Sequence, residues 1–175
     1  MPYTRLYLLV EGDDDVRFVE RVVIPKLSSR YDCAQPWKFA QKKKEKVNAF
    51  LRSIKAMGAD YVLLADINAH PCFPKKKEAL LQAFIELEST KTVIVVREIE
   101  GWYLAGLNDD NPLGVQAPTD TSGVTKEQFN ATMPKGFDSR IAYMIEVLKR
   151  FDTHAAATRN PSFLYFAQRC GLLRS

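Results

Sequence analysis

Three short, continuous apolar runs predict buried strands. They cover Leu6–Val10, Tyr61–Ala65 and Thr92–Val96. A strand that is covered on both faces shows no alternation of polar and apolar residues, so runs of this kind are typical of the interior of a parallel sheet. A weaker run, Trp37–Phe39, predicts one more short strand. We therefore expect a sheet of about four mostly parallel strands.

Between these runs, apolar residues recur with the spacing of an α-helix. The predicted helices start at Asp14, Lys42, Lys75, just beyond Glu98, at Ser139 and at Asn160. Pro25 should kink or end the first of them. The helix from Lys42 should run to Met57, before Gly58. Strands that alternate with helices predict an α/β fold of Rossmann-like type, with helices on both faces of the sheet and further helices at the C-terminus.

The length of 175 residues suits one domain. We expect residues 1–107 to form the α/β core and residues 138–175 to form helices that pack on it. Between them, residues 108–137 are rich in Pro, Gly, Asp, Asn and Thr, and this composition predicts a loop or a small excursion.

Acidic residues follow the predicted strands. Glu11 comes directly after the first, Asp66 after the second and Glu98 after the third. The carboxyl ends of parallel strands lie at one edge of the sheet, where sites gather. Carboxylates brought together there repel one another unless a cation is present. The pattern therefore predicts a site for Mg²⁺ or Mn²⁺, with one or two ions.

The expected ligands are oxygen donors, which hard cations prefer. Asp66 and Glu98 are the first choice, and Asn68 is a neutral candidate. Glu100 is a further candidate, with a solvated helix face as the alternative. Asp13 and Asp14 are better explained as residues that begin a helix, because acids are favourable at helix N-termini.

Two lysine clusters stand at predicted helix N-termini, where cations oppose the helix dipole. They are Lys42, Lys43 and Lys44, and Lys75, Lys76 and Lys77. A solvated helix face is one explanation. The other is a phosphate-binding surface beside the acids, with DNA or RNA as the partner. The net charge of +4 alone does not decide between them.

Composition narrows the class of protein further. With 46% hydrophobic and 26% charged residues, the chain is typical of a globular protein. Its apolar runs are too short to cross a membrane, and its start does not resemble a signal peptide. Three scattered cysteines without CxxC spacing argue against a disulfide framework. A cytoplasmic location is therefore expected.

Several motifs together resemble the Toprim fold of topoisomerases, bacterial primases and the overcoming-lysogenization-defect nucleases. Val10-Glu11-Gly12 is similar to the glutamate-glycine element after the first strand, and Asp66-Ile67-Asn68 is similar to the later Asp-x-Asp element. The chain is closer still to an uncharacterised Toprim-related family of bacteria and archaea. The similar segments are VEGDDDVRF, PKL at 25–27, EIEGWYLA from Glu98 and PSFLYF at 161–166.

The resemblance implies a metal-dependent enzyme that acts on nucleic-acid phosphodiesters, with a nuclease as the main expectation. It implies that Glu11 is a metal ligand or the proton-transfer group, and that Asp15 serves a second ion. Asn68 stands where many relatives have aspartate and contributes no charge. A non-catalytic nucleic-acid-binding or accessory module with a degenerate site is therefore the alternative. A phosphoacceptor receiver domain is a distant third, because the segment after Thr92–Val96 lacks the required hydroxyl residue.

Overall fold

A computed structural model describes residues 3–173 of the chain. Its fold comprises two compact units, and the division falls between Ile94 and Val95. The first unit holds the strands and the helices that alternate with them. The second unit holds the remaining helices.

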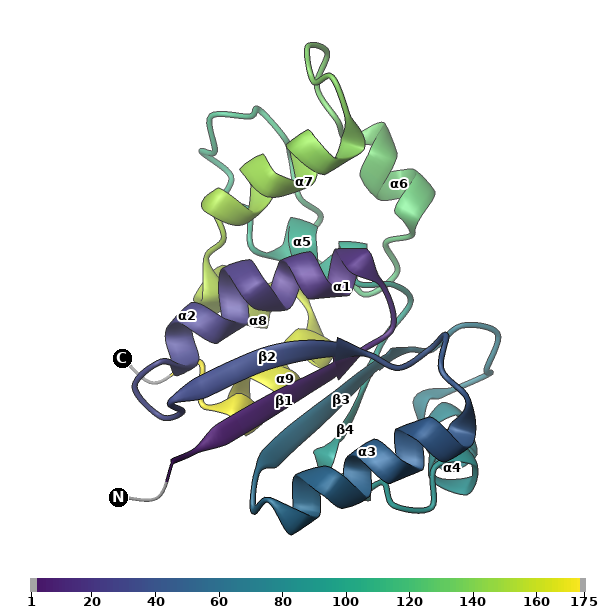
Figure 1. The fold of residues 1–175 in the computed structure, drawn as a ribbon. Coiled ribbons are helices and arrows are strands. Elements are labelled where there is room, and N and C mark those ends of the chain that lie inside the picture. Colours follow the sequence, from purple (N-terminus) through teal and green to yellow (C-terminus); the bar gives the residue numbers. More distant parts are fainter. Residues whose placement is uncertain (1–2, 174–175) are drawn as a thin grey trace. The chain divides into compact units, whose positions relative to one another are not determined.

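Four parallel strands form one sheet in the order β2-β1-β3-β4, so the predicted α/β class is confirmed (Figure 1). The strands are β1 (Arg5–Val10), β2 (Cys33–Lys38), β3 (Asp60–Asp66) and β4 (Thr92–Val95). The weakly predicted strand at Trp37 is real and begins earlier, at Cys33. It tolerates Pro36 because β2 is an edge strand, and a proline there need not donate to a second neighbour.

The register of the central pair brings two predicted site segments to the same edge. Leu6 of β1 pairs with Asp60 of β3, and Leu9 pairs with Leu63. Both strands run in the same direction, so the residues that follow them lie at one end of the sheet. Glu11 follows β1 there, and Asp66 is the last residue of β3.

Helices cover both faces of this sheet. They are α1 (Asp13–Phe18), the π-helical η1 (Val19–Val23), α2 (Ile24–Leu27), α3 (Lys44–Ala56) and α4 (Phe73–Ala83), with the 3-10 turn η2 (Ser89–Lys91) before β4. Figure 1 shows α1 and α2 on one face, and α3 and α4 on the other. The predicted helix from Lys42 is thus confirmed within two residues at its start, and Gly58 has the positive φ of a C-terminal cap.

Pro25 neither ends nor visibly breaks the first helix. The chain passes through the π-helical turn η1 and continues as α2 to Leu27. A proline has no N–H, and its ring clashes with the carbonyl four residues earlier in a regular α-helix. The wider π turn relieves that conflict, since it places Pro25 in the first turn of a new helical segment.

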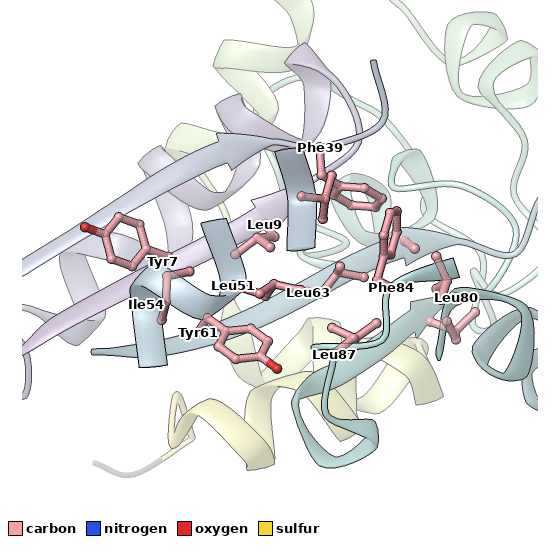
Figure 2. Packing of buried hydrophobic residues seen from close by; sticks show 13 residues of the cluster. Tyr7, Leu9, Phe39, Leu51, Ile54, Tyr61, Leu63, Leu80, Phe84 and Leu87 are labelled. Carbon is pink, nitrogen blue, oxygen red and sulfur yellow. The ribbon is translucent and has the colours of Figure 1, made fainter. Parts of the chain in front are cut away.

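The core of the first unit lies between the sheet and the helices α3 and α4 (Figure 2). Alternate residues of the central strands point into it, among them Leu9 of β1 and Leu63 of β3. Leu51 and Ile54 meet them from α3, and Leu80 from α4. The other residues of these strands are also buried, which explains why the strand sequences show no polar alternation.

The second unit contains five helices among its described residues. They are α5 (Glu100–Ala105), α6 (Lys126–Ala131), α7 (Arg140–Lys149), α8 (Thr153–Arg159) and α9 (Pro161–Cys170). The start of α9 is as the sequence indicated, because the Asn160 side chain accepts the N–H of Phe163 and Pro161 is in the first turn. Two of the five helices, α6 and α8, were not predicted.

The segment 108–137 is therefore not only a loop. Helix α6 begins with a capping box in which the Thr125 hydroxyl accepts the N–H of Gln128, and the Gln128 side chain accepts the N–H of Thr125. The Thr-x-x-Gln pattern of that box is a recognised start signal for a helix. On α7, the buried face is centred on Tyr143 and Val147, whereas Ile141 is 51% exposed.

Aromatic rings fill the interior of the second unit. Trp102 packs against Phe163 and Phe166 with ring centroids 5.2 and 5.1 Å apart. Its indole N–H donates to the Ser162 hydroxyl over 2.9 Å. A Cβ on Gly106 would lie 2.2 Å from the Phe151 ring, so glycine is required there for close packing. Within residues 3–173, no helix is both long and apolar enough to span a membrane.

Candidate functional site

The site is built around Glu11, at the carboxyl end of β1. The strand before it is fully buried up to Val10, and the helix α1 begins two residues later at Asp13. The Glu11 side chain retains 20% exposure. It is therefore a carboxylate at the rim of a buried strand, accessible to a small ligand but poorly solvated.

Three groups from other elements surround the Glu11 carboxylate. The backbone N–H of Asp66 and the side-chain amide of Asn68 form hydrogen bonds with it. The Lys76 Nζ lies 3.7 Å from Glu11 Oε1. The acid after β1, the acid at the end of β3 and the first turn of α4 thus meet at one edge of the sheet.

These surroundings act in opposite directions on the pKa of Glu11. Burial is the largest effect and raises it, because removal of water disfavours the charged form. The positive charge of Lys76 and the hydrogen bonds from Asp66 and Asn68 lower it, but the net result is a pKa above the usual value. A carboxyl group with a raised pKa accepts and returns a proton more readily than an ordinary glutamate does.

Asn68 reaches this site through an unusual backbone conformation. Its φ is +52°, in the left-handed region that few non-glycine residues occupy. Asparagine is among the side chains that tolerate this region best. The left-handed turn directly after β3 brings the Asn68 amide back to Glu11 and gives the Asp-x-Asn element its shape.

Lys76 is the residue of the site whose position the sequence did not reveal. It is buried on the same side of α4 as Leu80, one turn away. Leu80 on α4, and Phe84 and Leu87 just beyond the end of the helix, belong to the core cluster of the first unit. A charged residue on an apolar stripe is a signal that was readable in the sequence, although Lys75 and Lys77 on either side concealed it.

The other acids of the opening segment have local partners. Asp15 is buried, and its Oδ2 accepts the N–H of Gly12 over 3.0 Å at the start of α1. Asp14 pairs with Arg17, and Asp13 pairs with Lys38 at the surface. Asp13 and Asp14 are thus in the first turn of α1, where the sequence placed them.

Glu98 and Glu100 belong to the second unit and face different partners. The Glu98 carboxylate accepts the backbone N–H of Lys126 at the start of α6. Glu100 is buried and forms an ion pair with Arg140 of α7. The two glutamates therefore contact different elements of the second unit. Just before them, Arg97 is exposed and has a φ of +63°, a strained conformation for arginine.

The remaining predicted lysines are at the surface of the first unit or near it. Lys43 and Lys44 are exposed, and the Lys42 ammonium lies 5.2 Å from the centroid of the Trp37 ring. Lys75 is exposed and pairs with Glu78 over 3.2 Å, and Lys77 is partly buried. Of these six lysines, Lys76 is the buried one, and its ammonium pairs with the predicted site acid Glu11.

The donors of the first unit are of the type that a hard cation takes. Glu11 and Asp66 supply carboxylate oxygens, and Asn68 supplies an amide oxygen. No three His, Cys, Asp or Glu side chains in the described part of the chain are grouped closely enough to hold a metal by themselves. The set therefore fits one hard ion that keeps several waters, as Mg²⁺ commonly does, with the neutral Asn68 as the third donor.

Comparison of the chain with protein-family models, with curated proteins and with solved structures finds no match. The functional proposal therefore depends on the residues of the site and their geometry.

Proposed function

We propose that the protein is a Toprim-like, Mg²⁺- or Mn²⁺-dependent enzyme that cleaves nucleic-acid phosphodiesters. The observation that supports this most is the meeting of Glu11 with the Asp-x-Asn element at the carboxyl edge of the sheet. Burial of the Glu11 carboxylate and the left-handed turn at Asn68 both cost the fold free energy. Features of this kind gather at functional sites.

Each residue has a distinct task in this proposal. Asp66 and Asn68 hold the ion through their side-chain oxygens. Bound Mg²⁺ or Mn²⁺ would neutralise the scissile phosphate and lower the pKa of a bound water. Glu11 takes or returns the proton, because its raised pKa brings it closer to neutral pH than an ordinary glutamate.

Lysines near this edge would attract the substrate. Lys75 and Lys77 precede and follow Lys76 at the start of α4, and Lys42 and Lys43 precede α3, whose first residue is Lys44. Contacts of lysines with phosphates are independent of sequence and weaken with salt. We expect binding to DNA or RNA without a strong preference for sequence.

The test is cleavage of fluorescent single- and double-stranded DNA and RNA by the purified protein with Mn²⁺, Mg²⁺ or EDTA. Wild-type protein should cleave at least one substrate with metal and none with EDTA. Glu11→Gln and Asp66→Asn should each lower the rate by about 10²-fold or more. Asp13→Asn is the matched control, since Asp13 is 79% exposed and pairs only with a surface lysine. Cleavage that survives both site variants would refute the proposal.

One observation favours a second candidate. Lys76 already neutralises Glu11 in part, and Asn68 brings no charge, as expected of a site that has lost its ion. In that case the protein is an accessory module that binds nucleic acid without cleaving it. Salt-dependent binding that is unchanged by EDTA, together with no cleavage of any substrate, would support this candidate.

A further inference from the structure

Lys76 occupies a position that is unfavourable for a cation in two respects. It is buried, and burial of an ammonium group costs free energy unless a partner compensates. It also lies in the first turn of α4, where the helix dipole disfavours positive charge. An uncharged residue would satisfy the apolar stripe of α4 at lower cost, so the charge itself needs an explanation.

The explanation lies in the group that Lys76 faces. Its Nζ lies 3.7 Å from Glu11 Oε1, and Glu11 in turn forms hydrogen bonds with the Asp-x-Asn element. The neighbouring residue Lys75 points to solvent and pairs with Glu78 on its own helix. Lys76 thus places a fixed positive charge beside the Glu11 carboxylate, where a second metal ion would otherwise add one.

The acid that the resemblance suggested for a second ion is engaged elsewhere. Asp15 is buried at the start of α1, and its Oδ2 accepts the Gly12 N–H over 3.0 Å. Asn68 is neutral, whereas a second carboxylate would be needed to balance more positive charge. Two cations held within a few ångströms of each other also repel strongly in a poorly solvated site.

We propose that Lys76 takes the place of a second metal ion beside Glu11, so that the site binds a single divalent cation. This inference rests on the proposed function, since it concerns the same metal site. Lys76 is a positioning residue: its ammonium lies 3.7 Å from Glu11 Oε1 and disfavours a second ion by its charge. Phosphate attraction is left to the exposed lysines around it.

The test is Mn²⁺ titration followed by electron paramagnetic resonance, which counts bound ions without any need for activity. Wild-type protein should bind one Mn²⁺ per chain. Lys76→Gln keeps a long side chain and removes the charge, and it should bind a second Mn²⁺ or bind the first about tenfold more tightly. Lys75→Gln, the matched control on the adjacent position, should behave as wild type.

The possible outcomes distinguish a failure of this inference from a failure of the proposed metal-dependent function. Two Mn²⁺ ions in wild-type protein, or a folded Lys76→Gln variant with wild-type binding, would overturn the role of Lys76 and leave the metal site intact. No Mn²⁺ binding in either wild-type protein or Lys76→Gln would overturn both. If Lys76→Gln does not fold, Lys76→Met preserves the apolar stem and serves as the test variant. The wild-type ion count is decisive in either case.

Discussion

The two units of the protein each bury an acid beside a base, and the two pairs differ in ways that separate structure from chemistry. In the second unit, Glu100 is buried with Arg140, which also donates to Asn130 over 2.7 Å and lies over the Phe129 ring at 5.8 Å. In the first unit, Glu11 meets Lys76 at 3.7 Å and stays partly exposed, with a raised pKa. The Glu100–Arg140 pair is held from several sides, whereas in the Glu11–Lys76 pair the charge of the acid is only partly compensated.

The difference teaches how to assign two acids that looked equivalent in the sequence. A planar guanidinium that is fixed by an amide and a ring satisfies its carboxylate partner, so Glu100 has a structural role. An ammonium is a point charge on a flexible stem, and at 3.7 Å it leaves the carboxylate able to take other partners. Glu11 is therefore the better candidate for chemistry.

The largest expected effect comes from breaking the pair in the second unit. Glu100→Ala leaves the partly buried Arg140 guanidinium without its carboxylate, and removal of one partner of a buried pair costs up to about 3–5 kcal/mol. Unfolding in urea measures the loss. Asp110→Ala, on the exposed surface of the same unit, is the control and should change the free energy of unfolding by less than about 0.5 kcal/mol. If Glu100→Ala lowered the free energy of unfolding as little as the control does, the structural role of the Glu100–Arg140 pair would be refuted.

Glu11→Gln should do the opposite and stabilise the protein. Burial outweighs Lys76 and the hydrogen bonds and raises the pKa of Glu11, so the folded chain disfavours the charged carboxylate more than the unfolded chain does. Substitutions that relieve a functional site commonly yield about 0.5–2 kcal/mol. Thermal unfolding at pH 8, with Glu20→Gln as the exposed control, measures the gain.

The pH dependence of this gain follows from the direction of the shift. Below the ordinary value of 4.5, Glu11 is protonated in both the folded and the unfolded chain, so the variant has no advantage. As pH rises through 4.5, the unfolded chain ionises first and wild-type stability falls until the folded group ionises as well. The advantage of Glu11→Gln should thus be absent at low pH and complete at pH 8. An equal stability advantage at low pH and at pH 8 would show that it does not come from the ionisation of Glu11.

Substitution of the exposed lysines should affect binding rather than stability. If Lys75 contacts one phosphate, Lys75→Gln should reduce the slope of log affinity against log salt by about 0.7–0.9. Lys76→Gln should leave that slope unchanged, because Lys76 is buried against Glu11. Fluorescence anisotropy with a labelled oligonucleotide at several salt concentrations measures both. Equal slopes for wild type and Lys75→Gln would remove Lys75 from the binding surface.

The smallest effect is expected for the surface pair beside the site. Asp13 and Lys38 are 2.7 Å apart, but their side chains are 79% and 50% exposed. Exposed pairs contribute about 0.2–1 kcal/mol in double-mutant cycles. A cycle with Asp13→Ala and Lys38→Ala should give a coupling energy in that range, far below the loss for Glu100→Ala. A coupling energy as large as the loss for Glu100→Ala would show that solvent exposure does not explain the difference between the Asp13–Lys38 and Glu100–Arg140 pairs.

Much of the fold was predictable because its signals are local. The apolar runs set β1, β3 and β4, and Asn160 with Pro161 marked the start of α9. The placement of Glu11 with Asp66 at one sheet edge also follows from parallel strands alone. Helix α6 carried a readable capping box at Thr125, which the surrounding polar composition obscured.

The features that were not predicted depend on distant partners. Glu100 and Arg140 are 40 residues apart, and nothing in the spacing of the two glutamates shows that only one of them is buried in an ion pair. Lys76 sits in a run of lysines whose common charge suggests one common role. Its inward direction becomes clear only when the stripe of Leu80, Phe84 and Leu87 is traced back by one turn into the core.

Anomalous scattering from crystals grown with Mn²⁺ tests the central claim most directly. We expect one peak per chain, within ligand distance of the side-chain oxygens of Asp66 and Asn68 and beside Glu11. The Glu100 carboxylate should remain with Arg140 and hold no ion. No peak at Asp66, or one held by Glu98 and Glu100 without Asp66, would contradict the assignment of the site.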